Sequence, residues 1–305
     1  GLCRTERMFN EPERLSMIRE FILADSPEKK AAAIERLGNL QKRDFMALFK
    51  ELKGLPIIIR LLDLPLHEFL PKEQETEDPW LKRRISDLKE VNPMLGHRGV
   101  RLAVTHPEIY RMQIRAIEEA QAEVPADVSI MVPQVITSQE AMLVKSFLKE
   151  SGVGFGVMME TVRACMRAGE LAHEVDFFSF GTNDLTQAVY SFSREDAEKK
   201  FLSTYFDAGI LKDNPFEIID VKGVGRLMET AIFWARRAKR EIKISVCGEQ
   251  AGEPRSIRFF HGIGVDNVSC SPFRIQVAKL VAAQAAIKTR TDVEMEFINY
   301  AKKVV

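Results

Sequence analysis

Seven short apolar runs, most of them followed directly by polar or charged residues, set the pattern of this chain. Helical stretches separate most of the runs. Short buried strands that alternate with helices predict a parallel sheet. A parallel sheet closed into a barrel gathers the carboxyl ends of its strands at one mouth, where active sites lie. The runs occupy residues 1–3, 57–59, 128–132, 156–159, 177–180, 242–246 and 267–268.

The number of runs predicts an incomplete barrel. A closed (β/α)8 TIM barrel needs eight strands, whereas this pattern has seven and its first run begins at residue 1. Either the eighth strand is unrecognised or an N-terminal piece is missing, and we favour the second. The predicted fold class is therefore an α/β TIM barrel that lacks its first strand at the N-terminus.

Helices account for most of the remaining chain. The longest helical stretch, 12–53, is divided by a turn at which Ser26 is a good N-cap with Pro27 in the first turn behind it. We predict a barrel domain over 1–288 and a helical tail over 289–305. Further helices are predicted at 106–122, 137–150, 161–173, 221–240 and 273–288.

One connection is unusually long. Residues 63–96 are rich in Pro, Glu and Lys and exceed the length of an ordinary βα loop. Such a segment over the mouth of a barrel can act as a lid, and it can equally be a surface insertion. The sequence leaves both interpretations open.

Composition limits the partners of this chain. The 305 residues are 46% hydrophobic and 29% charged, which supports a substantial core. The 44 basic and 44 acidic side chains cancel, so no global positive field favours nucleic acid or a membrane surface. No apolar run reaches the roughly 18 residues of a spanning helix. Anion binding must therefore come from a few placed arginines.

The four cysteines, at 3, 165, 247 and 270, have no CxxC or disulfide-framework spacing. We expect an intracellular, cytoplasmic protein with reduced thiols. Cys247 and Cys270 both lie at the ends of apolar runs. A thiol in such a setting can act as an acid or base on carbon, and the residues alone favour neither cysteine over the other.

Two carboxylates are candidate metal ligands. Glu160 and Asp184 each follow an apolar run, and the two runs are neighbours in the predicted order of strands. Mg²⁺ prefers oxygen ligands and commonly takes one or two carboxylates, so we predict an Mg²⁺ site at this pair. The alternatives are a helix N-cap for Asp184 and a solvated charge for Glu160. The turn Gly181-Thr182-Asn183-Asp184 also offers backbone N–H groups to an oxyanion or carboxylate.

Strand-end arginines are candidate anion ligands. Arg4 and Arg60 each end an apolar run, and Arg98, with Arg101 nearby, extends the set. The guanidinium fork suits phosphate or carboxylate. The alternative is a structural salt bridge to Glu6 or Asp63.

Five segments together resemble pyruvate, phosphate dikinases, within the superfamily that includes phosphoenolpyruvate synthase and enzyme I of the sugar phosphotransferase system. The resemblance extends to about residue 287. The Ser-Cys-Ser-Pro-Phe-Arg and Leu-His-Glu-Phe-Leu stretches favour the dikinases within the superfamily. The segments are Gly1-Leu2-Cys3-Arg4-Thr5-Glu6, Arg60–Leu70, Asn92–Arg101, Phe177–Gln187 and Val268–Arg274.

The resemblance implies a phosphoenolpyruvate/pyruvate-binding barrel that interconverts its two ligands by phosphoryl transfer. It implies that Arg4 and Arg60 bind the phosphoryl group, that Glu160 and Asp184 hold Mg²⁺, and that Cys270 exchanges the proton at the methyl carbon. It places Gly181, Thr182 and Asn183 at the substrate, and it implies a phosphohistidine domain and an ATP-grasp domain as partners. A homodimer through the barrel is also expected.

The chain departs from the family pattern at a few positions. Val162 stands where a proline is usual after the metal glutamate, and Gln250-Ala251 stand where His-Gly is usual. These changes bear on activity more than on fold. Two other functions fit the same pattern of residues: another Mg²⁺-dependent barrel enzyme such as a 2-oxo acid aldolase or lyase, and a non-catalytic binding or dimerisation module.

Overall fold

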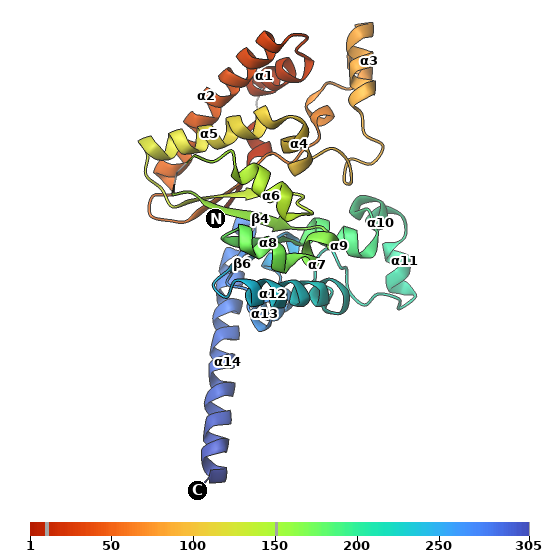
Figure 1. Cartoon of the computed structure of the whole chain (residues 1–305). Coiled ribbons are helices and arrows are strands. Elements are labelled where there is room, and N and C mark those ends of the chain that lie inside the picture. The colour runs from red at the N-terminus through yellow and green to blue at the C-terminus, as the bar shows by residue number, and fades with distance from the viewer. Residues whose placement is uncertain (10–11, 150–151, 305) are drawn as a thin grey trace. The chain divides into compact units, whose positions relative to one another are not determined.

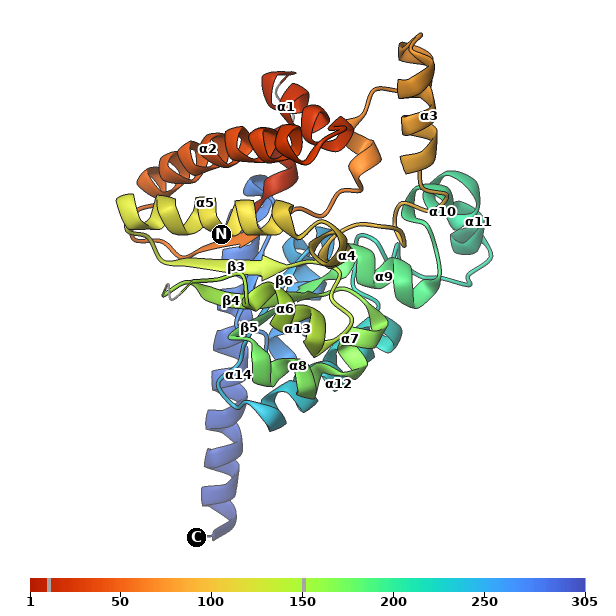
Figure 2. The ribbon, with the colours of Figure 1, turned by 45° about the horizontal axis from the view of Figure 1, so that its top comes forward.

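The computed structural model describes residues 1–9, 12–149 and 152–304. The chain forms two compact units. The first unit comprises 1–158 with 174–176, and the second comprises 159–173 with 177–305. Figures 1 and 2 label the α-helices and several of the strands.

The strands of the first unit are β1 (Leu2–Arg4), β2 (Ile57–Arg60), β3 (Val128–Val132) and β4 (Gly154–Met159), of which β4 has its last residue in the second unit. Each pairs in parallel with the next in sequence. The side chains of β2, β3 and β4 are largely buried, as expected for parallel strands covered by helices. The register places Arg4 beside Arg60, so both arginines end their strands at the same edge.

Helices α2 (Pro27–Glu51) and α5 (Pro107–Glu123) lie side by side in the first unit (Figures 1 and 2). The Ser26 hydroxyl accepts a hydrogen bond from the Lys29 amide at 3.3 Å, which confirms the predicted N-cap of α2. Gly38 lets the two helices approach closely, because a Cβ there would lie 3.1 Å from Met112 Cγ. The remaining elements of this unit are η1 (Thr5–Phe9), α1 (Pro12–Leu23), η2 (Leu66–Phe69), η3 (Glu73–Glu75), α3 (Pro79–Leu88), α4 (Val100–Thr105) and α6 (Ser138–Lys145).

The second unit contains β5 (Phe177–Gly181), β6 (Lys243–Cys247) and β7 (Asn267–Ser269), again paired in parallel in sequence order. The register aligns Gly181 with Cys247 and Cys247 with Ser269, so the three strands end level with one another. Most of the helices follow these strand ends. They are α7 (Val162–Met166), α8 (Ala168–Glu174), α9 (Thr182–Tyr190), α10 (Arg194–Lys200), α11 (Leu202–Asp207), η4 (Val221–Gly225), α12 (Arg226–Ala238), η5 (Glu249–Gly252), α13 (Pro254–Gly262), η6 (Pro272–Arg274) and α14 (Ile275–Val304).

The described residues thus hold seven parallel strands that alternate with helices, which confirms the predicted α/β class of a TIM barrel with one strand fewer. Several helices differ from the prediction in extent. The stretch at 161–173 is two short helices, and the predicted helix at 137–150 ends at Lys145. Helix α14 runs across residue 288, Val305 lies outside the described residues, and the domain boundary at 288 stays a prediction. Among the described residues, no helix has the length and apolar character needed to cross a membrane.

Candidate functional site

Arg60 is the centre of a buried ion-pair cluster in the first unit. Its guanidinium lies 3.1 Å from a Glu6 carboxylate oxygen and 3.1 Å from an Asp63 carboxylate oxygen. A third contact joins its Nη1 to the sulfur of Met158 at 3.8 Å. Arg60 and Glu6 are each 8% exposed, and Asp63 is 1% exposed. A buried guanidinium held by two carboxylates on one side keeps its fork in a fixed orientation.

Arg98 joins the same cluster through Asp63. Its Nε and Nη2 donate to the two Asp63 carboxylate oxygens at 3.0 and 2.6 Å, a bidentate geometry. The neighbouring Gly99 has φ +59°, and a Cβ there would lie 2.7 Å from Gln134 Cβ, so the turn that presents Arg98 requires glycine. Arg60 and Arg98 thus make the ion pair to Asp63 that the sequence left open as an alternative to anion binding.

The other two arginines of the predicted set are placed differently. Arg4 is exposed, and its register with Arg60 directs both side chains to the same face of the strands. Arg101 Nη1 donates to the Gly96 carbonyl at 2.7 Å and so stabilises its own loop. Arg4 is therefore the more accessible cation at this edge of the first unit.

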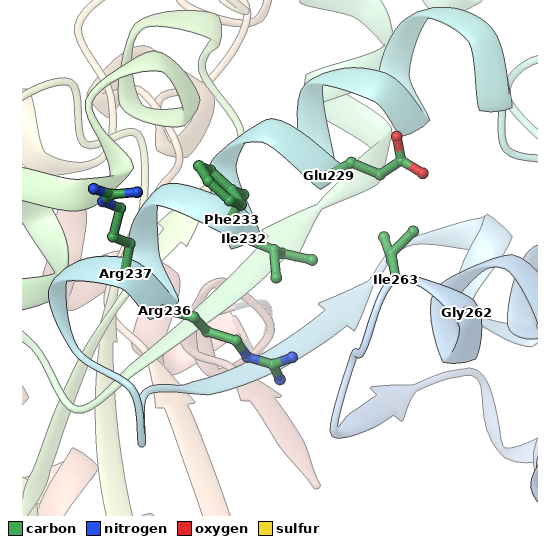
Figure 3. A pocket seen from close by; sticks show the side chains of 7 residues that line it. All are labelled: Glu229, Ile232, Phe233, Arg236, Arg237, Gly262 and Ile263. Atoms are coloured by element: carbon green, nitrogen blue, oxygen red, sulfur yellow. The ribbon is translucent and has the colours of Figure 1, made fainter.

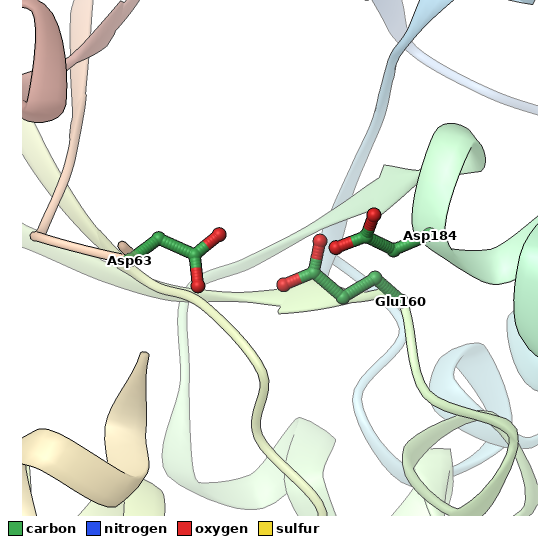
Figure 4. A group of neighbouring side chains, drawn as sticks. All are labelled: Asp63, Glu160 and Asp184. Atoms are coloured by element: carbon green, nitrogen blue, oxygen red, sulfur yellow. The ribbon is translucent and has the colours of Figure 1, made fainter. Parts of the chain in front are cut away.

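Glu160 and Asp184 are brought together in the second unit. Figure 4 shows their carboxylates turned toward one another, and one oxygen of each lies within 4.8 Å of the other. Glu160 is 3% exposed. The Gln187 side chain donates to Asp184 Oδ1 at 3.4 Å. Figure 4 also draws Asp63, which belongs to the cluster of the first unit.

Local sequence explains the position of both carboxylates. Glu160 directly follows β4, and Thr161 next to it caps α7 by accepting a hydrogen bond from the Ala164 amide at 3.2 Å. This cap begins the helix at Val162 without the proline that is usual in the family. Asp184 lies in the first turn of α9, where the helix dipole favours a negative charge.

The carboxylate pair fits a divalent cation. Two like charges at most 4.8 Å apart repel by at least about 3 kcal/mol at an effective dielectric constant of about 20, and burial of Glu160 adds to the cost of its charge. A cation between the two groups removes both penalties. The oxygen-only donor set is the one that Mg²⁺ prefers.

The turn at Gly181–Asp184 contacts the turn that follows β6. The Thr182 hydroxyl lies 2.8 Å from the Cys247 carbonyl and 2.7 Å from Gln250 Oε1. The Glu249 amide donates to Asn183 Oδ1 at 3.0 Å. Thr182 is fully buried, so its hydroxyl serves the protein interior, whereas Asn183 is partly exposed.

The two strand-end thiols differ in exposure. Cys247 is 8% exposed and accepts a hydrogen bond from the Ser179 hydroxyl at 3.8 Å. Cys270 is partly exposed and follows β7 directly. Burial raises the pKa of the Cys270 thiol, with a smaller opposing contribution from the Arg274 charge. The charged thiolate form of Cys270 is therefore disfavoured.

A separate hollow lies along α12 (Figure 3). It measures about 500 Å³ and opens between α12 and the end of α13. Arg236 on its wall is already engaged by the Gly264 carbonyl and by Asp266 at 3.6 Å. None of the site residues predicted above lines this hollow, so its size does not mark it as the reactive centre. The lining residues are Glu229, Ile232, Phe233, Arg236, Arg237, Gly262 and Ile263.

Sequence reasoning undervalued three residues. The sequence indicated Glu6 and Asp63 only as alternative salt-bridge partners of the arginines. It indicated Gln250 only as a departure from the family pattern. Asp63 follows β2 by three residues, so the rule that strand ends carry chemistry could have found it. No local signal marks Gln250, since its partners lie 35 to 68 residues away.

Comparisons with known proteins show the family of the chain. The family model described as the PEP-binding domain of PEP-utilising enzymes matches residues 1–287. Pyruvate, phosphate dikinases from Entamoeba histolytica and Rhizobium meliloti are each 45% identical to the chain, over 94% and 97% of it, and pyruvate, phosphate dikinase 1 of Arabidopsis thaliana is 43% identical over 94%. The chain covers 36%, 36% and 33% of their lengths, so it spans about a third of these relatives.

Proposed function

Because the chain belongs to the family of PEP-binding domains of PEP-utilising enzymes, we propose that it binds phosphoenolpyruvate and pyruvate and interconverts them by phosphoryl transfer. The reaction class is that of its pyruvate, phosphate dikinase relatives. The observation that supports the proposal most directly is the close pair of carboxylates at Glu160 and Asp184 beside the first turn of α9.

Each predicted residue has a role in the proposed reaction. Arg4, Arg60 and Arg98 bind the phosphoryl group, because the guanidinium fork matches three anionic oxygens and stabilises the charge that spreads over them during transfer. Glu160 and Asp184 hold Mg²⁺, which when bound would supply positive charge opposite the oxygens of the substrate.

The turn at the start of α9 orients the substrate in this proposal. Gly181, Thr182 and Asn183 present backbone N–H groups at a helix N-terminus, which suits a carboxylate. Cys270 gives its proton to the methylene carbon when phosphoenolpyruvate becomes pyruvate, and takes a proton from the methyl carbon in the opposite direction.

The proposal includes partners. Phosphoryl transfer needs a phosphohistidine donor, and its recharging needs an ATP-grasp domain. The chain spans about a third of its dikinase relatives, which leaves room for both in proteins of that length. A homodimer through the barrel domain at 1–288, a helical tail at 289–305 and a cytoplasmic location belong to the same proposal.

A thermal-shift experiment with Mg²⁺ and oxalate tests the proposal. Oxalate resembles the enolate of pyruvate, and a ligand that binds only the folded chain raises its melting temperature. Asp184→Asn keeps the size of the side chain and removes its charge, so it should abolish the rise. Asp213→Asn is the matched control, because Asp213 pairs with the exposed Arg255 in the same unit and should leave the rise intact. An unchanged response in Asp184→Asn would remove the metal site from the proposal.

A further inference from the structure

Gln250 lies at the centre of a fully buried hydrogen-bond network in the second unit. Its Nε2 donates to the Pro215 carbonyl at 2.7 Å and lies 3.4 Å from the Thr186 hydroxyl. Its Oε1 accepts from the Thr182 hydroxyl at 2.7 Å. Gln250, Thr182 and Thr186 are each 0% exposed. One amide thus joins the turn after β6, the first turns of α9 and the segment before η4.

The orientation of this amide is dictated by its partners. The Pro215 carbonyl can only accept, so the amide nitrogen must face it, and the amide oxygen must then face Thr182. Thr182 has a single hydroxyl hydrogen for two acceptors, Gln250 Oε1 and the Cys247 carbonyl. An apolar side chain at position 250 would leave the Pro215 carbonyl without this donor and would remove one acceptor from Thr182.

The backbone beside Gln250 reinforces the same contact. Gly248 has φ +111°, and a Cβ there would lie 2.3 Å from Thr182 Oγ1 and 3.0 Å from Asn183 Oδ1. The Glu249 amide donates to Asn183 Oδ1 at 3.0 Å, which turns the Asn183 amide nitrogen away from Glu249. The turn 248–250 therefore contacts two consecutive residues of α9, Thr182 and Asn183. These two residues directly precede Asp184.

We propose that Gln250 is a positioning residue for the ligand-binding turn at 182–184, holding Asp184 and Asn183 in place through its hydrogen bond to the Thr182 hydroxyl. This role rests on the proposed function. In this role Gln250 acts on the ligand site through Thr182. A shift of the first turn of α9 moves the Asp184 carboxylate relative to Glu160, and octahedral Mg²⁺ tolerates little displacement of its ligands.

The test measures Mg²⁺-dependent oxalate binding by calorimetry on the 305-residue chain. Gln250→Leu should bind Mg²⁺-oxalate about tenfold more weakly or worse, since it removes the hydrogen bond that holds Thr182 and leaves the Pro215 carbonyl without the Gln250 donor. Gln250→His at pH 8 should restore binding to within about threefold of the parent, because a neutral imidazole can accept from Thr182 and donate to the Pro215 carbonyl. Gln41→Leu is the matched control: Gln41 is 2% exposed in α2 of the first unit, and its loss should leave binding unchanged.

A double-mutant cycle separates positioning from general destabilisation. Thr182→Val removes the hydroxyl from the other side of the same hydrogen bond, so the double variant should bind no more weakly than the weaker single variant. If Gln250→Leu does not fold, Mg²⁺-oxalate binding is compared between Thr182→Val, which loses the hydrogen bond to position 250, and Gln250→His, which keeps it. Parent-like binding by Gln250→Leu, or fully additive losses in the cycle, would overturn the positioning role alone. Absence of Mg²⁺-oxalate binding in the parent would overturn the proposed function and the positioning role with it.

Discussion

Replacement of Asp63 by alanine should destabilise the first unit strongly. Asp63 is the carboxylate that Arg60 and Arg98 share, at 3.1 Å from Arg60 and through two hydrogen bonds from Arg98. Asp63→Ala removes that carboxylate and keeps both guanidiniums in place. Arg60 retains Glu6 at 3.1 Å, whereas Arg98 loses both of these bonds.

The magnitude follows from burial. The side chains of Arg60, Arg98 and Asp63 are 10%, 15% and 1% exposed, so solvent screens the pairs weakly. Removal of one partner from a buried ion pair typically costs about 3 to 5 kcal/mol, because the remaining charge stays desolvated without compensation. We expect the free energy of unfolding to fall by about this amount.

Urea unfolding followed by circular dichroism measures the loss as a shift of the midpoint at constant slope. Asp25→Ala is the matched control in the same unit. Asp25 pairs with Lys29 at 2.9 Å, but both side chains are more than 60% exposed, and solvent leaves such pairs little effect on stability. Equal losses in the two variants would refute the reasoning, because they would mean that water solvates Arg60 and Arg98 as fully as it does Lys29.

Three further predictions concern the second unit. Gly248→Ala should lower the free energy of unfolding by more than about 2 kcal/mol, because φ at this position is +111° and the new Cβ would meet Thr182. The control Gly54→Ala, at φ +80° with open space around it, should lower the free energy of unfolding by about 1 kcal/mol. Urea titration measures both losses. Cys270→Ala should keep Mg²⁺-oxalate binding and lose Mg²⁺-dependent exchange of pyruvate methyl protons with deuterated water. The control Cys247→Ala should retain most of this exchange. Exchange at the parent rate in Cys270→Ala would exclude the Cys270 thiol as the acid/base. The rate of Cys270 alkylation by iodoacetamide should rise at higher pH than the rate for free cysteine, because burial raises the pKa of the thiol and the thiolate is the reactive form. A pH profile of the rate like that of free cysteine would contradict this prediction.

The central strands β2 to β6 were predictable because most of their residues are buried on both faces. Runs such as Ile57–Ile59 and Phe177–Phe180 contain almost no polar residues, and both coincide with β2 and β5 to within one residue. Ser26 was predictable as an N-cap because capping depends on neighbours only three residues away. Helices α10 and α11 were harder to predict, because α10 is highly charged and α11 is only six residues long.

The candidate residues were predictable by type and less so by partner. Glu160 and Asp184 follow strands that the sequence shows, so their convergence could be expected. The split of Arg60 between Glu6 and Asp63 depends on rotamers and on pairing across 54 residues, which no local pattern encodes. Gln250 looked like a departure from the family pattern, and only the contact with Thr182, 68 residues away, shows what the amide does.

The ion-pair cluster around Arg60 has one further consequence. Its two guanidiniums and two carboxylates, from Arg60, Arg98, Glu6 and Asp63, sum to zero charge. An anion that engages either arginine therefore meets a guanidinium whose charge a carboxylate already balances. An electroneutral cluster attracts distant anions weakly. Selectivity of this cluster for an incoming anion then comes from how well the oxygens of the anion match the guanidinium forks, whereas long-range attraction comes from the exposed Arg4.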